Sequence, residues 1–313
     1  MEALPLSKTS WLDMKFINKK ITGSVLLLCS AALYGLVGVF SRYIREFAPF
    51  SQSWVKSSFL LLIVFLFFIS KKVTWKKIRR EDLKWFALWI LPASFQPVLT
   101  FLAFNHLAIG TTYFLTYSTM ILGGILSGKI FFSEKLNLNK ILSLLLLFIG
   151  LFLIYKSDIT FARNIYVFFA LLAGLLLGFW NTLTKKVSGN YPEFQMIVLD
   201  NATALLLCFG VSMFIGEKLP VLEDVVPWIW IVLFAASLTA AAFLLIRGFK
   251  FVEAQVGTLI LPMEVVFGSF FGFLFFGEVL KINVYLGGFI ILMAAILSAL
   301  GLSKSNDLPQ QII

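Results

Sequence analysis

The chain has 313 residues, of which 60% are hydrophobic and only 13% are charged, and its mean hydropathy is +0.94. Soluble domains carry about 25% charged residues, so this composition excludes a soluble globular protein and indicates an integral membrane protein. The formal net charge of +10 comes from basic residues in the loops between apolar runs, so it predicts the orientation of the chain and not nucleic-acid binding.

Ten apolar runs are long enough to cross a hydrocarbon core about 30 Å thick. The connections between them are short and leave no room for a soluble catalytic domain. We therefore predict an all-α integral membrane protein with ten transmembrane helices and no cleaved signal peptide. The predicted spans are 22–44, 51–70, 84–104, 109–131, 139–155, 165–184, 194–215, 226–246, 254–276 and 283–302.

The segment before the first span, residues 1–21, is basic and is predicted to be a cytoplasmic tail. Most other basic residues fall in loops on the same side of the membrane, above all in the loop at 71–84, which we expect to contact anionic lipids. Because ten is an even number, the C-terminal segment 303–313 is also predicted to be cytoplasmic, and its composition indicates disorder. We expect the inner membrane of a bacterial-type cell.

The first two spans each carry a polar side chain at depth. In the first span Tyr34 precedes Gly35, and its ring can either line a pore or pack against neighbouring helices. In the second span Lys56 is expected to extend its amine toward the outer surface. Along the membrane normal Lys56 lies about 10 Å from Asp200 of the seventh span, so no direct ion pair is predicted.

The third and fourth spans supply prolines, an amide and hydroxyl groups. Pro92 and Pro97 remove backbone N–H groups on either side of Gln96, so we expect an interrupted third helix with freed carbonyls, a feature typical of transporter sites. The fourth span offers Tyr113 and Tyr117 near its middle. We predict that both tyrosines and Gln96 contact the substrate.

The sixth and seventh spans add three further candidates. Trp180 and Asn181 follow a glycine at a depth greater than an interfacial belt requires, and we predict that they contact the substrate. Asp200 is either a proton-titrating group that couples transport to protons or a structural acceptor for neighbouring polar groups.

The ninth span carries the strongest signal. Pro262 leaves the carbonyl of Thr258 without its helical partner, and Glu264 follows two residues later at membrane depth. A carboxyl beside a freed carbonyl is costly in hydrocarbon unless it faces protein or water. We therefore predict a helix break at Pro262, a second at Pro97, and a central cavity into which Glu264 points as substrate ligand or proton-coupling group.

The chain is predicted to be an internal duplication. Shifting it by 144 residues places FFSEKL at 131–136 over FFGEVL at 275–280, and two glycines of the fourth span over two of the ninth. A shift of 143 aligns the first two spans with the sixth and seventh. Five spans are an odd number, so the repeats, residues 22–157 and 158–302, must be inverted and suit alternating access.

Several kinds of chemistry have no motif here. The sequence has one histidine, His106, which we interpret as a helix-end residue, and two cysteines in separate apolar runs, Cys29 and Cys208, which we interpret as buried packing residues. It contains no zinc-binding H-E-x-x-H motif, no Cys/His cluster and no phosphate-binding loop. We therefore predict no enzyme activity, no metal and no cofactor.

The stretch AQVGTLILPMEVVFGSFFGFLFFGE at 254–278, together with the duplicated FFSE and FFGE ends, resembles the EamA-type transporters of the drug/metabolite transporter superfamily. The resemblance covers about residues 24–302. It implies a ten-helix basket whose cavity is lined by spans 1, 3, 4, 6, 8 and 9, and which exports amino acids or other small metabolites.

We therefore predict a secondary transporter, proton-coupled or facilitative, for small polar or amphipathic organic molecules. Its expected partners are the substrate, a proton as candidate co-substrate and membrane lipids, and we expect a monomer or weak homodimer. A membrane-embedded lipid-modifying enzyme or a flippase-like lipid carrier is the alternative. The candidate substrate-binding residues are Tyr34, Gln96, Tyr113, Tyr117, Trp180, Asn181 and Glu264, and the coupling candidates are Glu264 and Asp200.

Overall fold

The computed structural model describes residues 8–70, 74–107, 109–156, 159, 165–220 and 224–300, and no strand occurs within these ranges. One short 3₁₀ helix, η1 (Arg80–Asp82), precedes α4. The α-helices are α1 (Lys8–Gly35), α2 (Val37–Tyr43), α3 (Pro49–Ile69), α4 (Leu83–His106), α5 (Ile109–Phe132), α6 (Leu138–Tyr155), α7 (Ile165–Ser188), α8 (Glu193–Phe214), α9 (Val226–Phe249), α10 (Ala254–Ile260), α11 (Met263–Phe276) and α12 (Ile282–Leu300).

Ten helical segments of the described chain are long and apolar enough to cross a membrane. They confirm the predicted spans, and the ends differ by four residues or fewer. The first span consists of α1 and α2, and the ninth of α10 and α11. The chain is helical from Lys8, since no proline or glycine interrupts residues 8–22, so much of the predicted tail continues the first membrane helix. Residues 1–7 and 301–313 lie outside the described residues.

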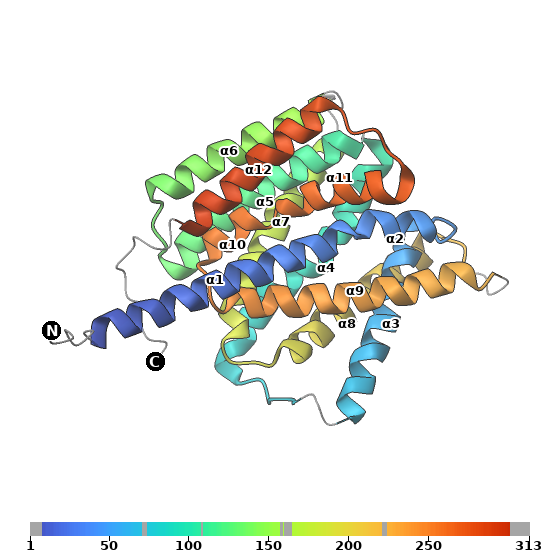
Figure 1. The fold of residues 1–313 in the computed structure, drawn as a ribbon. Coiled ribbons are helices and arrows are strands. Elements are labelled where there is room, and N and C mark those ends of the chain that lie inside the picture. Colours follow the sequence, from blue (N-terminus) through green and yellow to red (C-terminus); the bar gives the residue numbers. More distant parts are fainter. Residues whose placement is uncertain are drawn as a thin grey trace, which may run out of the picture.

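The two halves of the chain pack in a pattern that repeats when spans one to five are exchanged with spans six to ten. Helix α1 packs on α9 and α11, and α7 packs correspondingly on α4 and α5. Helix α3, the second span, packs on its repeat equivalent α8, the seventh span. Helix α6, the fifth span, likewise packs on its equivalent α12, the tenth span. The start of α1 and the end of α12 lie at the same end of the bundle, and α6 and α12 lie together on its outside (Figure 1). This pairing is that of two inverted five-span units.

Two glycines show the same relationship at the level of single residues. A Cβ on Gly35 of α1 would lie 2.9 Å from Gly268 N of α11, and a Cβ on Gly178 of α7 would lie 2.7 Å from Gly124 N of α5. These four glycines are twins, meaning that they occupy equivalent positions in the two repeats: Gly35 and Gly178 are 143 residues apart, and Gly124 and Gly268 are 144 residues apart. Each crossing therefore requires a residue without a side chain, because backbone meets backbone there.

The third span does not have the predicted interruption. Helix α4 runs continuously from Leu83 to His106 through Pro92 and Pro97, so the predicted break at Pro97 is wrong. Each proline removes one backbone hydrogen bond, and packing along a neighbouring helix can hold the remainder of the turn in place. Helix α4 packs along α7, to which Trp89 Nε1 donates a buried hydrogen bond of 2.8 Å at Thr184 Oγ1.

The fourth and ninth spans end in the same cap. Glu134 N donates to Gly128 O over 3.2 Å, and Glu278 N donates to Gly272 O over 3.4 Å. In each cap the residue before the glutamate has left-handed backbone geometry, with φ +53° at Ser133 and +63° at Gly277. Each helix thus ends at a left-handed residue, a position at which glycine is the favoured residue.

These twin caps predict opposite effects of matched substitutions. Ser133→Gly is expected to stabilise the protein by up to about 1 kcal/mol, because glycine adopts positive φ without the steric cost that serine has. Gly277→Ala is expected to destabilise it by about 1 kcal/mol, since alanine must adopt the strained geometry. Thermal unfolding of both purified variants in one detergent tests this. A lower melting temperature for Ser133→Gly than for wild type would contradict the shared cap.

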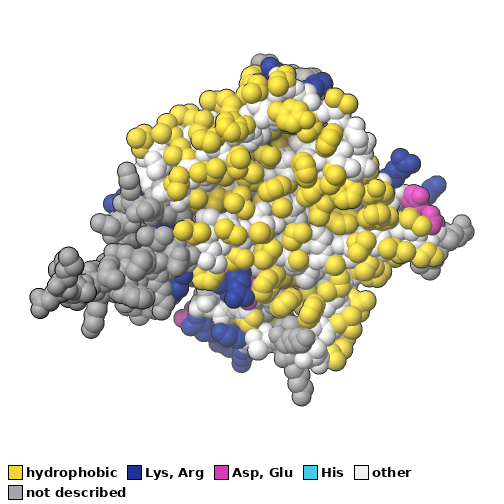
Figure 2. All heavy atoms as spheres, in the orientation of Figure 1, with side chains coloured by type: hydrophobic (Ala, Val, Ile, Leu, Met, Phe, Trp, Pro, Cys, Tyr) yellow, Lys and Arg dark blue, Asp and Glu magenta, His cyan; other side chains and the backbone are white. Residues whose placement is uncertain are grey.

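The outer surface is apolar across the spans. Exposed large hydrophobic residues occur on nearly every membrane helix, among them Phe65, Phe168, Leu206 and Phe289. Figure 2 shows hydrophobic side chains spread over the visible face, with charged side chains gathered mostly toward its margins. Such a surface suits a lipid environment, because lipid tails cover it without the cost that water would impose.

Candidate functional site

The ninth span is split at Pro262, as predicted. Pro262 cannot donate to the carbonyl of Thr258. Glu264 N donates instead to Leu261 O over 2.9 Å, and Val265 N donates to Pro262 O over 3.0 Å, so tight three-residue turns replace the regular helix. Glu264 is therefore held in the first turn of α11, where the backbone N–H groups of a helix favour a negative charge.

The half-buried Glu264 side chain lies among hydroxyl groups from two other helices. The Tyr117 hydroxyl of α5 lies in hydrogen-bonding range of its carboxyl group, and Tyr34, in the last turn of α1, lies within electrostatic range of it. No described residue forms an ion pair with Glu264. The structure thus places two of the predicted site residues, Tyr34 and Tyr117, near the Glu264 carboxyl group, which lacks a cationic partner among the described residues.

Two breaks in the helices meet at this point. Helix α1 ends at Gly35, and α2 begins at Val37 after a single turn residue. A Cβ on Gly35 would lie 3.2 Å from Glu264 O and 2.8 Å from Phe267 Cβ. The interrupted first span therefore crosses the interrupted ninth span at the turn that carries Glu264. Crossings of discontinuous helices are typical sites of substrate and ion binding in transporters.

A wall of aromatic rings lies next to the carboxyl group. The Tyr113 ring centroid is 5.0 Å from that of Phe104, 6.0 Å from that of Tyr155 and 6.1 Å from that of Tyr117. Tyr113 is half-buried and also lies within electrostatic range of Glu264. Such rings offer an apolar face and a polar edge to an amphipathic molecule.

A second polar group is centred on Asp200 of α8. Its half-buried side chain lies within electrostatic range of Lys56 of α3 and of Tyr34, and next to the Trp180 indole. Lys56 and Asp200 form no ion pair, as the sequence predicts, and Lys56 Nζ lies 5.9 Å from the Phe234 ring centroid instead. Tyr34 therefore lies within electrostatic range of both acidic groups.

The other predicted residues occupy separate places. Gln96 of α4 is half-buried and donates through Nε2 to Thr100 Oγ1 of its own helix over 2.9 Å. Asn181 of α7 is 2% exposed, and its Oδ1 has no hydrogen-bond partner among the described residues. The Trp180 N–H is also buried without an acceptor at normal distance. Asn181 Oδ1 is therefore a buried acceptor without a partner among the described residues, the Trp180 N–H lies near Asp200, and the Gln96 amide has one local partner.

The site is asymmetric with respect to the internal repeat. The twin of Glu264 in the fourth span is Met120, which is 2% exposed and apolar. The twin of Pro262 is Ser118, and α5 is continuous there. Only the ninth span therefore carries a carboxyl group and a helix break at these positions, while the fourth span contributes the rings of Tyr113 and Tyr117.

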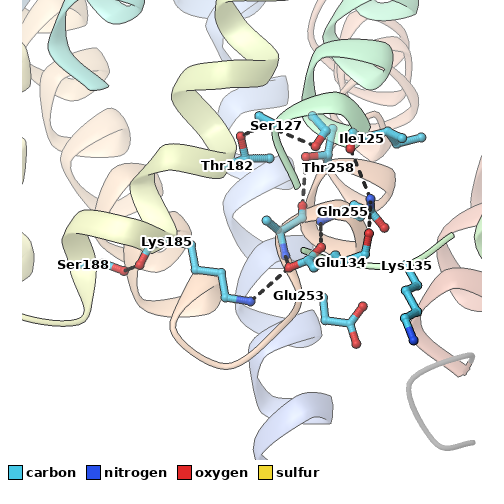
Figure 3. Close-up of polar contacts among 12 residues, drawn as sticks. Ile125, Ser127, Glu134, Lys135, Thr182, Lys185, Ser188, Glu253, Gln255 and Thr258 are labelled. Carbon is cyan, nitrogen blue, oxygen red and sulfur yellow. Dashed lines mark hydrogen bonds and ion pairs between the residues drawn. The ribbon is translucent and has the colours of Figure 1, made fainter. Parts of the chain in front are cut away.

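A further cluster, which the sequence interpretation missed, surrounds Glu134 after the fourth span. Its carboxylate accepts from Ala254 N over 2.7 Å and from Gln255 N over 2.8 Å, and forms an ion pair of 3.3 Å with Lys185 (Figure 3). Lys140, which is 3% exposed, contacts Glu253 at 2.6 Å and Gln255 Oε1 at 2.7 Å. The duplicated FFSE and FFGE ends were the available signal, since they marked Glu134 and its twin.

Comparisons with known proteins agree with this architecture. The model of the EamA-like transporter family matches twice, over residues 21–156 and 164–300. An uncharacterized transporter of Archaeoglobus fulgidus is 22% identical over 283 residues, which are 88% of this chain and 96% of that protein. A solved crystal structure superposes with a TM-score of 0.75 at 12% identity, over 89% of this chain and 96% of that one, and so shares the fold.

The two family matches coincide with the two five-span halves whose packing repeats, and together they cover most of the chain. Within the described ranges no group of three or more His, Cys, Asp or Glu residues is placed to hold a metal ion. The chain belongs to the EamA-like transporter family, and it is a multi-pass membrane transporter and not an enzyme.

Proposed function

We propose that this protein is a secondary transporter that exports small organic metabolites such as amino acids by alternating access. The observation that carries the proposal is the Glu264 carboxyl group, which lies without an ion-pair partner among the described residues at the crossing of two broken helices. A carboxyl group at membrane depth is costly and is kept where it binds a substrate or ion. The transport is either coupled to protons or facilitative.

The neighbouring groups fit the amine-bearing end of an amphipathic molecule. Glu264 would accept from an ammonium group or carry a proton, while Tyr117, in hydrogen-bonding range of it, and Tyr34, within electrostatic range of it, would supply hydroxyl groups. Tyr113 and Trp180 would pack against the carbon skeleton, and the unpaired Asn181 Oδ1 would accept from a polar group. Asp200 is the second candidate for proton coupling, and Gln96 is a substrate contact only if its bond to Thr100 opens.

The proposed orientation places both termini in the cytoplasm of a cell with a bacterial-type inner membrane. Its support is the distribution of basic residues, which gather in loops on the side of the N-terminus. In this orientation Glu134 and Lys185 lie at the cytoplasmic ends of their spans, and Arg42 and Glu278 lie at the outer ends. We further propose that the protein acts as a monomer or weak homodimer.

Ligand screening by thermal unfolding tests the substrate class. The purified protein would be heated in the presence of amino acids, nucleosides, sugars and simple amines, and one amine-bearing class is expected to raise the melting temperature. A ligand at 100 times its dissociation constant stabilises the folded state by about 2.7 kcal/mol, which is readily measured. Counterflow of the radiolabelled hit into proteoliposomes then establishes transport.

Two outcomes would count against the proposal. Turnover or flipping of a lipid phosphate by the detergent-solubilised or reconstituted protein would favour the lipid-directed alternative. Saturable flux that persists only for uncharged sugars would leave Glu264 without the proposed role. Empty liposomes and liposomes with heat-inactivated protein provide the background.

A further inference from the structure

Two ion pairs of this protein are twins. Lys185 Nζ lies 3.3 Å from Glu134 Oε1, and an Arg42 guanidinium nitrogen lies 2.5 Å from Glu278 Oε1. Lys185 and Arg42 are related by the offset of 143 residues, and Glu134 and Glu278 by the offset of 144. The first pair joins the end of the fourth span to the end of the sixth. The second joins the end of the ninth span to the end of the first.

The same backbone device positions both glutamates. In each case the glutamate N–H bonds back to a glycine carbonyl six residues earlier, Gly128 for Glu134 and Gly272 for Glu278. The carboxylate then lies over that glycine, since a Cβ on Gly128 would be 3.2 Å from Glu134 Oε2 and one on Gly272 would collide with Glu278 Oε2. Both pairs are therefore built features of the duplicated unit.

The two pairs lie at opposite ends of the bundle. The Glu134 carboxylate binds the first backbone N–H groups of α10, which begins the ninth span, whereas Glu278 follows α11, which ends it. The ninth span has 23 residues, which at about 1.5 Å per residue separates the two pairs by roughly 35 Å. In Figure 1 the start of α10 and the end of α11 point to opposite sides of the molecule.

The two pairs differ in burial. The side chains of Lys185 and Glu134 are 25% and 7% exposed, whereas those of Arg42 and Glu278 are 55% and 40% exposed. Water and salt screen an exposed ion pair much more than a buried one. The Arg42–Glu278 pair is therefore the easier one to separate.

The pair at the Glu134 end is also reinforced by residues that have no equivalent at the other end. The Lys140 amine binds Glu253, Gln255 and the carbonyl of Lys135 at 2.6, 2.7 and 2.8 Å. The twins of Lys140 and Glu253 are Val284 and Ile109, which carry no charge. One end of the bundle is thus closed by a network, and the other by an exposed ion pair.

We propose that these twin ion pairs are the two gates of the transporter, and that their unequal reinforcement sets its resting state. The Arg42–Glu278 gate opens in the resting protein and exposes the central site to that side, the outer side in the proposed orientation. The Glu134–Lys185 gate opens only when the network around Lys140 is also released. This inference rests on the proposed function, because a gate implies alternating access.

Distances between spin labels across each gate test the proposal without any substrate. In a background in which Cys29→Ser and Cys208→Ser remove the native thiols, one label pair at Leu138 and Gly189 spans the Glu134 end. A second pair, at Arg45 and Val279, spans the Glu278 end. All four positions are exposed, and a Cβ on Gly189 meets nothing within 4 Å. In liposomes the wild-type protein is expected to give one narrow distance for the first pair and an additional longer distance for the second.

Single substitutions are expected to move one label pair each. Glu278→Gln should shift the 45–279 distances fully to the longer population, and Glu134→Gln should create a longer population for 138–189. The double exchange Arg42→Glu with Glu278→Arg should restore the wild-type 45–279 distribution, which a merely structural role would not do. If Glu134→Gln does not yield a monodisperse protein, Lys185→Gln removes the same ion pair and leaves the bonds of Glu134 to α10 intact.

Glu217→Gln is the matched control. Glu217 accepts from Phe50 N and Ser51 N at 3.0 and 2.8 Å and so caps α3, but it belongs to neither twin pair. Neither label distance should change in this variant. Unchanged distances in both Glu134→Gln and Glu278→Gln, or changes of the same label pair in both, would overturn the gate assignment. If the spin-label distances respond as expected but the protein transports no small molecule into proteoliposomes, the proposed function is overturned and not the assignment of the ion pairs.

Discussion

Glu264→Gln is expected to reduce substrate transport by a factor of roughly 30 to 4,000. The proposed role pairs Glu264 with the ammonium group of the bound substrate; losing one partner of such a hydrogen-bonded charge pair costs about 2–5 kcal/mol, and each 1.4 kcal/mol is a factor of ten in affinity. The amide of glutamine has nearly the same size and can still bond the Tyr117 hydroxyl, so the expected loss comes from the charge and the exchangeable proton. Initial rates of uptake into proteoliposomes measure it.

The two roles open to Glu264 give different results in this assay. If it couples transport to protons, an imposed pH gradient drives accumulation by wild-type protein and has no effect on the variant, which can still exchange substrate across the membrane. If it binds the substrate amine, both net uptake and exchange are lost, and the thermal stabilisation by the ligand disappears with them. Glu264→Asp, which keeps the charge on a shorter side chain, is expected to lie between the two.

Glu193→Gln makes the same chemical change elsewhere and serves as the control. Glu193 pairs with Lys250 at 2.9 Å at the start of α8 and contacts none of the predicted site residues. Its variant is expected to transport at close to the wild-type rate. Full transport by Glu264→Gln with unchanged pH dependence would show that the carboxyl group has no part in the mechanism.

Gly178→Ala is expected to destabilise the protein by up to about 2 kcal/mol. The added Cβ would collide with Met120 O and lie 2.7 Å from Gly124 N, so backbone atoms of α5 and not flexible side chains would have to move. Overpacking of this kind costs about 1–3 kcal/mol and outweighs the roughly 1 kcal/mol that alanine gains over glycine in a helix. The melting temperature and the yield of monodisperse protein in detergent report the change.

Gly210→Ala is the matched control within the same repeat. Gly210 lies exposed in α8, and a Cβ there meets no atom within 4 Å. Its variant should be as stable as the wild type or more stable by up to about 1 kcal/mol, because only the gain in helix propensity remains. Equal melting temperatures for Gly178→Ala and Gly210→Ala would contradict the close crossing of α7 and α5.

Much of the fold could be predicted because membrane helices satisfy their own backbone. Ten apolar runs of sufficient length have no other stable structure in lipid, so their number and approximate ends follow from hydropathy alone. The break at Pro262 was also predictable, since proline cannot donate to Thr258. The same argument failed at Pro97, where α4 stays continuous alongside α7, because the outcome at a proline depends on what packs against the helix.

The candidate site was predictable in part. The sequence indicated Glu264, Tyr34, Tyr113 and Tyr117 separately, from polar groups at membrane depth, and the structure places them around one point. Gln96 bonds to Thr100 of its own helix, four residues later, a spacing at which helical side chains meet and which the sequence already contained. The importance of Glu134 was missed because a glutamate at the end of a span looks like an ordinary solvated residue.

The sequence by itself determined that the protein has ten spans, that its halves are inverted copies, and that Asp200 and Glu264 fall within spans, because these follow from periodicity, parity and composition. Only the tertiary structure decided which helices cross, and therefore which residues meet. The contact of Gly35 with the turn of Glu264, and the pairing of Lys185 with Glu134, join residues separated by long stretches of sequence. Such contacts depend on packing between helices, which the pattern within a single helix does not encode.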